Sequence, residues 1–168
     1  GTSRGGTAVI YTAMKRFQAL WSPQFKGLAT FPLYPSCFER LDRDDEVSMP
    51  IHAFHGEIDD YASKAPCIAW IDRLAAQGRL ATNTVYPQAA HGYDNLLSST
   101  TPVVSPGAQS TRLCRISERA GALINTEENK PFAYTDRCVT RDPSIGHNPA
   151  ATVATQKAVL QALQALSR

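Results

Sequence analysis

A serine flanked by glycines opens the chain. Gly1-Thr2-Ser3-Arg4-Gly5-Gly6 reads G-x-S-x-G-G and runs directly into a segment with helical periodicity. This pattern predicts a nucleophile elbow, a tight turn between a strand and a helix that holds one serine in strained backbone geometry. Gly1 and Gly5 would face each other across the turn and leave room for it. The alternative is a glycine-rich helix start in which Ser3 is only the N-cap.

A serine nucleophile needs a general base, and the base needs an acid that orients it. The acid candidate is Asp59, in the loop His55-Gly56-Glu57-Ile58-Asp59-Asp60-Tyr61, and the base candidate is His91, in a later loop. The chain order of serine, acid and histidine is that of α/β-hydrolases. The N–H of Arg4, at a helix start, is predicted to point at an oxyanion formed beside Ser3.

Other residues compete for these roles. Asp60 is the second choice for the acid, although Asp60 or Glu57 could instead cap the following helix or line the mouth of the site. The remaining histidines fit less well, because His52 and His55 belong to a predicted strand and His147 lies beside the last predicted helix.

The elements that must position these side chains follow from periodicity and from the Pro and Gly residues between them. The pattern predicts a helix from Arg4 to about Leu20, strands over Leu28–Tyr34, Ile51–His55 and Leu80–Tyr86, a helix from Pro66 to about Gln77, and a last helix from Asn148-Pro149 to about Leu166. Pro32 removes a donor from the first of these strands, so we expect a strand end or bulge near it. Asp59 and His91 each follow a predicted strand. Polar loops after the strands are typical of an α/β fold, in which such loops carry the site.

Residues 97–147, called the flap here, depart from this pattern. The flap is long, polar and irregular, with small strands predicted over Leu113–Ile116, Ala122–Ile124 and Phe132–Tyr134. In the closing helix after it, the predicted inner positions are Val153, Val159, Ala162, Leu163 and Leu166.

Four cysteines indicate two disulfides and an oxidising compartment, periplasmic or secreted. Cys114 and Cys138 flank one irregular segment, and Cys37 and Cys67 follow neighbouring predicted strands, so we expect these two pairs. The alternatives are a bridge from Cys37 to Cys114, or four free thiols in a cytoplasmic protein. No C-x-x-C spacing favours a zinc site.

Composition excludes several classes of partner. The net charge is +2 and there is no basic run, which argues against nucleic acid as a ligand. No apolar run approaches membrane-spanning length. The predicted chemistry needs neither a metal nor an organic cofactor.

Three motifs together resemble one known group of enzymes. G-x-S-R-G-G, then H-G-E-x-D-D-Y followed by A-P-C, then Y-P-x-A-x-H-G-Y-D are similar to the dienelactone-hydrolase-related α/β-hydrolases. The resemblance implies that Ser3 is the nucleophile, Asp59 the acid and His91 the base. Dienelactone hydrolase itself uses a cysteine, so a serine here points to a general ester or similar acyl substrate.

The resemblance also implies the architecture. We expect residues 1–168 to form one α/β-hydrolase domain, with a mostly parallel sheet and flanking helices, the flap inserted at 97–147 and a closing helix at 148–168. The first strands of the sheet and the second oxyanion donor would come from an upstream segment or a second chain. Residues 1–168 alone are then expected to be poorly soluble and inactive toward short-chain esters.

The expected function is a serine hydrolase that cleaves a small-molecule ester or acyl substrate through an acyl-enzyme. Tyr34, Tyr61 and Tyr93 lie beside the predicted loops and could shape the substrate pocket or simply pack. The alternatives are a peptidase or acyltransferase on the same fold, or a hydrolase-like module that only binds.

Overall fold

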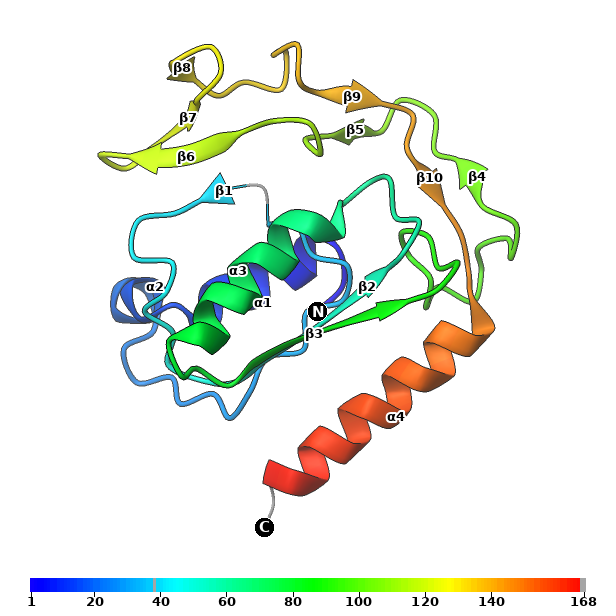
Figure 1. The fold of residues 1–168 in the computed structure, drawn as a ribbon, viewed down its shortest axis with the longest axis horizontal. Coiled ribbons are helices and arrows are strands. Elements are labelled where there is room, and N and C mark those ends of the chain that lie inside the picture. Colours follow the sequence, from blue (N-terminus) through cyan, green and yellow to red (C-terminus); the bar gives the residue numbers. More distant parts are fainter. Residues whose placement is uncertain (38, 167–168) are drawn as a thin grey trace.

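A computed structural model describes residues 1–37 and 39–166, which form four helices and ten strands (Figure 1). The helices are α1 (Arg4–Ala13), α2 (Lys15–Trp21), α3 (Lys64–Ala76) and α4 (Pro149–Leu166). The strands are β1 (Glu39–Arg40), β2 (Ile51–Gly56), β3 (Ala81–Tyr86), β4 (Val103–Val104), β5 (Gln109–Ser110), β6 (Ile116–Arg119), β7 (Ala122–Asn125), β8 (Lys130–Pro131), β9 (Thr140–Arg141) and β10 (Ser144–Ile145). Residues 167 and 168 of the predicted closing helix lie outside the described residues. None of the described helices has the length and apolar character needed to span a membrane.

The predicted fold class is wrong, because the described residues do not form the mostly parallel sheet of an α/β-hydrolase. The one wholly parallel sheet has two strands, β2 and β3, paired from Ile51 with Ala81 to Gly56 with Tyr86. The others are small: a four-stranded sheet in the order β1-β6-β7-β8, antiparallel from β6 onward, and the antiparallel pairs β10–β4 and β5–β9.

The strand predicted over Leu28–Tyr34 is also wrong. Residues in this segment pair with their neighbours through isolated parallel bridges, from Thr30 to Ile51 and from Leu33 to both Thr2 and Phe54. Pro32 has no N–H to donate to a ladder. Two bridging residues, separated by this proline, therefore replace a continuous strand beside β2.

The helix predicted from Arg4 to about Leu20 is divided at Met14. The backbone of Met14 is extended, with φ of −78° and ψ of 124°, and it forms an antiparallel bridge with Val47. The N–H of Lys15 donates to the carbonyl of Glu46 at 2.9 Å. Pairing with a distant segment thus interrupts a helix that the local sequence pattern favours.

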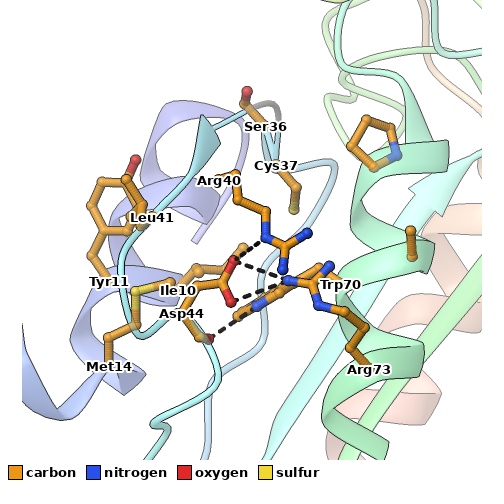
Figure 2. Close-up of a pocket in the computed structure, with 12 residues that line it drawn as sticks. Ile10, Tyr11, Met14, Ser36, Cys37, Arg40, Leu41, Asp44, Trp70 and Arg73 are labelled. Atoms are coloured by element: carbon orange, nitrogen blue, oxygen red, sulfur yellow. Dashed lines mark hydrogen bonds and ion pairs between the residues drawn. The ribbon is translucent and has the colours of Figure 1, made fainter. Parts of the chain in front are cut away.

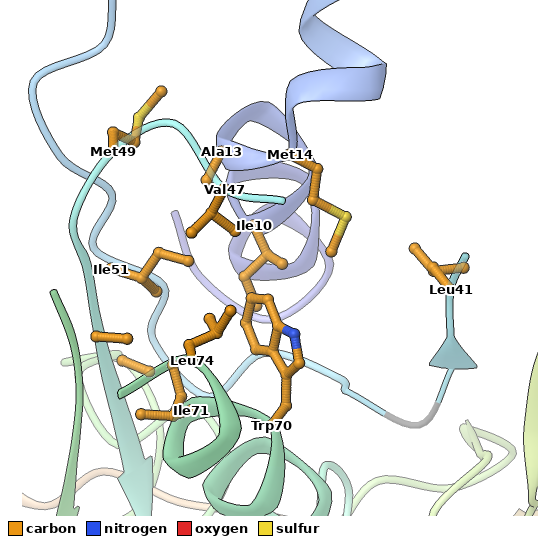
Figure 3. Close-up of a cluster of buried hydrophobic side chains, with 12 residues drawn as sticks. Ile10, Ala13, Met14, Leu41, Val47, Met49, Ile51, Trp70, Ile71 and Leu74 are labelled. Atoms are coloured by element: carbon orange, nitrogen blue, oxygen red, sulfur yellow. The ribbon is translucent and has the colours of Figure 1, made fainter. Parts of the chain in front are cut away.

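The predicted strands Ile51–His55 and Leu80–Tyr86 and the helix Pro66–Gln77 are confirmed, within two residues at each end, as β2, β3 and α3. Successive side chains of β2 point to opposite faces. Ala53 belongs to a core cluster with Trp70 and Leu74 of α3 and with residues of α1 (Figure 3). Phe54 belongs to a second cluster with Ala151 of α4. The two-stranded sheet therefore lies between α1 and α3 on one face and the start of α4 on the other.

The predicted inner face of α4 is only partly confirmed: Val159 packs against the cluster of Phe54 and Ala151, and Ala162 and Leu166 are half-buried. Its buried residues are Ala151, Thr152 and Thr155, whereas the side chains of Val153 and Leu163 are 64% and 48% exposed. Thr152 Oγ1 donates to the carbonyl of Tyr93 at 2.9 Å, so its burial leaves no unpaired hydroxyl. The predicted N-cap is confirmed, because Asn148 Oδ1 accepts from the N–H of Ala151 at 3.0 Å.

The flap contains strands β4 to β10 (Figure 1). It passes beside α3, where β6 pairs with β1, and continues through β10 to the start of α4. Of its three predicted strands, Ala122–Ile124 is confirmed as β7, whereas Leu113–Ile116 overlaps β6 only at Ile116 and Phe132–Tyr134 begins directly after β8. Both predicted disulfides are confirmed: Cys114 with Cys138 inside the flap, and Cys37 with Cys67 of α3. These two bridges account for all four cysteines of the sequence.

Candidate active site

Ser3 lies on a tight turn immediately before α1. Its backbone has φ of 50° and ψ of −120°, a conformation that L-residues other than glycine rarely adopt. The turn is held by two hydrogen bonds, from the N–H of Ser3 to the carbonyl of Leu33 at 3.0 Å and from the N–H of Leu33 to the carbonyl of Gly1 at 2.8 Å. The predicted strained turn is therefore present, although no continuous strand precedes it among the described residues.

The glycines around Ser3 are not equivalent. A Cβ on Gly1 would lie 2.4 Å from the carbonyl oxygen of Gly5, and a Cβ on Gly6 would lie 2.8 Å from that of Leu33. A Cβ on Gly5 would meet no atom within 4 Å. Gly1 and Gly6 therefore allow the close approach of the backbone at this turn, whereas the role predicted for Gly5 is not required by sterics.

The three side chains predicted to act together are joined by hydrogen bonds. Ser3 Oγ lies 2.8 Å from Nε2 of His91, and Nδ1 of His91 lies 2.9 Å from Oδ2 of Asp59. The side chains of Asp59 and His91 are 0% and 7% exposed. A carboxylate can only accept, so Nδ1 of His91 is the protonated nitrogen and Nε2 accepts from the Ser3 hydroxyl.

The loops after β2 and β3 bring Asp59 and His91 together. Oδ1 of Asp59 accepts from the N–H groups of Tyr61 at 2.9 Å and Ala62 at 2.8 Å, which fixes the carboxylate within its own loop. A Cβ on Gly56 would lie 2.2 Å from the carbonyl oxygen of Ala89. Only a glycine at the end of β2 therefore allows the loop that carries His91 to approach this closely.

Asp60, the alternative acid, has different partners. Its carboxylate forms an ion pair with Arg112 at 3.2 Å and accepts from the N–H of Ser144 at 2.7 Å. Its backbone carbonyl also accepts a short hydrogen bond from Arg112. Both partners belong to the flap, so Asp60 fastens the flap to the loop that carries Asp59.

Two of the three candidate tyrosines flank His91. The ring centroids of Tyr34 and Tyr61 lie 4.7 Å and 4.5 Å from that of His91. Burial, and then the hydrogen bond from its hydroxyl to Asp94, raise the pKa of Tyr34, so its phenol stays protonated. Tyr93 is fully buried, and its hydroxyl lies 3.0 Å from that of Thr155. Its ring packs against that of Tyr34, with the ring centroids 5.3 Å apart, and it does not line the cavity.

A cavity of about 690 Å³ opens over Ser3 and His91. The residues outside the flap that line it include Arg4, Thr7, Tyr11, Tyr34, Ser36 and Tyr61. The flap supplies Gln109, Ser110, Thr111 and Tyr134, none of which the sequence analysis identified. Ser110 Oγ donates to the carbonyl of Tyr61 at 2.6 Å, which joins this wall to the acid loop. No local motif identifies these flap residues as part of a site. Cys114 and Cys138 indicated only that part of the flap is held by a disulfide.

Arg4 is the first residue of α1 and lines the cavity. N–H groups in the first turn of a helix have no acceptor within that helix, and the helix dipole favours negative charge there. The start of α1 can therefore stabilise an anion beside Ser3. Among the described residues, no group of three or more His, Cys, Asp or Glu side chains could hold a metal ion.

Comparison of the chain with protein-family models, curated proteins and solved structures finds no match. The resemblance to dienelactone-hydrolase-related enzymes therefore rests on the three sequence motifs alone.

Proposed function

We propose that this protein is a serine hydrolase that cleaves an ester or related acyl substrate through an acyl-enzyme on Ser3. The observation that carries this proposal is the hydrogen-bonded series from Ser3 through His91 to Asp59, with distances of 2.8 Å and 2.9 Å. The strained backbone of Ser3 and the cavity above it support the same conclusion.

In the first stage, Ser3 Oγ attacks the carbonyl carbon of the substrate and its proton passes to Nε2 of His91. Asp59 holds the Nδ1–H tautomer and stabilises the imidazolium that forms. The oxyanion lies at the start of α1, where the N–H of Arg4 is the proposed donor; one such donor contributes about 3 kcal/mol to the transition state. The C–O bond to the alcohol then breaks, and the alcohol leaves with the proton from His91.

In the second stage, water attacks the acyl group on Ser3 and gives its proton to His91. The bond from the acyl carbon to Ser3 Oγ breaks, Ser3 regains the proton, and the carboxylic acid is released. The chain's own residues supply the nucleophile and both proton transfers.

The two disulfides fit a protein of an oxidising compartment. We propose that the protein works in the periplasm or outside the cell.

A fluorophosphonate probe tests the proposal, because it labels only an activated serine. The protein, expressed with any segment that its gene encodes before Gly1, should be labelled and should hydrolyse p-nitrophenyl acetate. Ser3→Ala should remove the labelling and lower the rate by at least about three decades. Ser22→Ala, at an exposed position outside the cavity lining, is the matched control and should keep both signals.

Absence of labelling in the unmodified protein would favour a module that only binds and would overturn the proposal. Labelling at Ser3 without ester hydrolysis would favour the alternatives, a peptidase or an acyltransferase, over an esterase.

A further inference from the structure

A second, smaller cavity lies between α1, α3 and the chain around β1 (Figure 2). Its volume is about 210 Å³, and its apolar lining includes Ile10, Met14, Leu41 and Trp70. Pockets for whole ligands usually span about 300–1,000 Å³. This cavity is therefore of a size to hold one apolar part of a ligand.

Tyr11 and Ser36 line both cavities, so the two cavities are neighbours. The N–H of Ser36 donates to Thr7 Oγ1 at 2.9 Å, and Thr7 lines the cavity of Ser3. Ser36 Oγ is buried and has no hydrogen-bond partner within the part of the chain that the structure describes. Because this oxygen is buried, it presents no exposed hydroxyl to an alkyl chain that passes the junction.

The polar groups at the far end of the small cavity are already paired with one another. The carboxylate of Asp44 accepts from Arg73 at 2.9 Å, and the carbonyl of Asp44 accepts from Trp70 Nε1 at 3.0 Å (Figure 2). Arg40 lies 3.7 Å from the same carboxylate. A charged group entering the cavity would have to compete with this network, whereas a neutral alkyl chain would contact the apolar wall without disturbing it.

We propose that the small cavity, lined by Ile10, Met14, Leu41 and Trp70, binds the acyl chain of the substrate. This inference rests on the proposed function and specifies its substrate class: esters of neutral, unbranched carboxylic acids longer than butyric acid. The alkyl part of the acyl group would extend from the carbonyl carbon at Ser3, pass between Tyr11 and Ser36, and end against Trp70. Each methylene buried there adds to transition-state binding.

Ala69 allows the small cavity to be filled without disturbing the core. It lies on α3, lines this cavity and is exposed. Ala69→Phe should lower kcat/KM for p-nitrophenyl octanoate about tenfold relative to wild type, while kcat/KM for p-nitrophenyl acetate changes less than about twofold. Ala75→Phe, at an exposed position of α3 outside this cavity, is the matched control and should leave the ratio of the two rates unchanged.

A second measurement does not depend on turnover or on the folding of the Ala69→Phe variant. In a Ser3→Ala, Trp21→Phe protein, Trp70 is the one remaining tryptophan, since the chain has two. Binding of octan-1-ol should change its fluorescence in a saturable way.

The outcomes separate the two proposals. If Ser3 is labelled by the probe but the octanoate-to-acetate ratio is the same in wild type and Ala69→Phe, or if octan-1-ol gives no saturable signal, the acyl-chain site is overturned and the proposed function stands. If Ser3 is neither labelled nor required for ester hydrolysis, both proposals fail.

Discussion

Asp59 and Asp60 are neighbours in the chain whose carboxylates point to different partners. Asp59 Oδ2 lies 2.9 Å from Nδ1 of His91, whereas Asp60 binds Arg112 and the N–H of Ser144 in the flap. The side chain of Asp59 is 0% exposed and that of Asp60 is 43% exposed. One carboxylate therefore belongs to the site and the other to the attachment of the flap.

This division predicts different kinetics for two conservative substitutions. Asp59→Asn should lower kcat by roughly three to four decades, because an amide no longer fixes the Nδ1–H tautomer of His91. Asp60→Asn should lower kcat less than about tenfold and should act mainly on KM through the flap wall. Steady-state kinetics with p-nitrophenyl acetate on both variants compares them directly, and the reverse order of effects would show that Asp60 is the acid.

His55 is predicted to make the protein sensitive to acid. Burial, which outweighs the opposing effect of Asp59, lowers the pKa of His55 from 6.5 to about 4, and both ring nitrogens lack partners in the described residues. Between these two pH values the unfolded chain binds a proton that the folded protein does not. Stability should therefore fall as the pH falls from 6.5 toward 4, by up to roughly 3 kcal/mol.

Urea denaturation at a series of pH values measures this dependence. His55→Leu should flatten it between those pH values, because the group that titrates is gone. His52→Leu changes a less buried histidine on the same strand and should flatten it less. An unchanged slope in His55→Leu would mean that other groups cause the acid sensitivity.

Two adjacent glycines of α1 should respond in opposite directions to the same substitution. Gly6→Ala places a Cβ 2.8 Å from the carbonyl oxygen of Leu33, which cannot move without shifting the turn at Ser3. We expect a loss of about 1–3 kcal/mol in the free energy of unfolding and lower activity. Gly5→Ala meets open space and should gain about 0.5–1 kcal/mol from helix propensity. Chemical denaturation of both variants decides the matter, and equal effects would be inconsistent with the packing at Gly6.

The disulfide of the flap should stabilise one wall of the site. Cys114 and Cys138 are 24 residues apart, and on the chain-entropy description such a bridge contributes roughly 3 kcal/mol. Replacing both by serine should lower the denaturation midpoint and raise KM, because Ser110 and Tyr134 of this wall would be less well held. A double variant with unchanged midpoint and KM would show that the ion pair of Asp60 with Arg112 holds the flap by itself.

Local sequence determined the parts of this protein that depend on neighbouring residues. G-x-S-x-G-G predicted the strained turn at Ser3, because few residue types tolerate such a backbone. Hydrophobic periodicity and Pro or Gly boundaries placed β2, β3 and α3, and the positions of Cys114 and Cys138 around one irregular segment predicted their bridge. The order of Ser3, Asp59 and His91 selected the three side chains that lie within hydrogen-bonding distance.

Only the tertiary structure decided the features that depend on distant partners. Met14 leaves the helical conformation because Val47, 33 residues later, pairs with it. The flap brings Gln109 and Tyr134 to the cavity through contacts between residues far apart in the chain. Asp60 shares its residue type and its loop with Asp59, so the sequence ranked it second as the acid without excluding it. The choice between them came from where Arg112 and Ser144 lie, because an ion pair or hydrogen bond forms with whatever the fold places within about 3 Å.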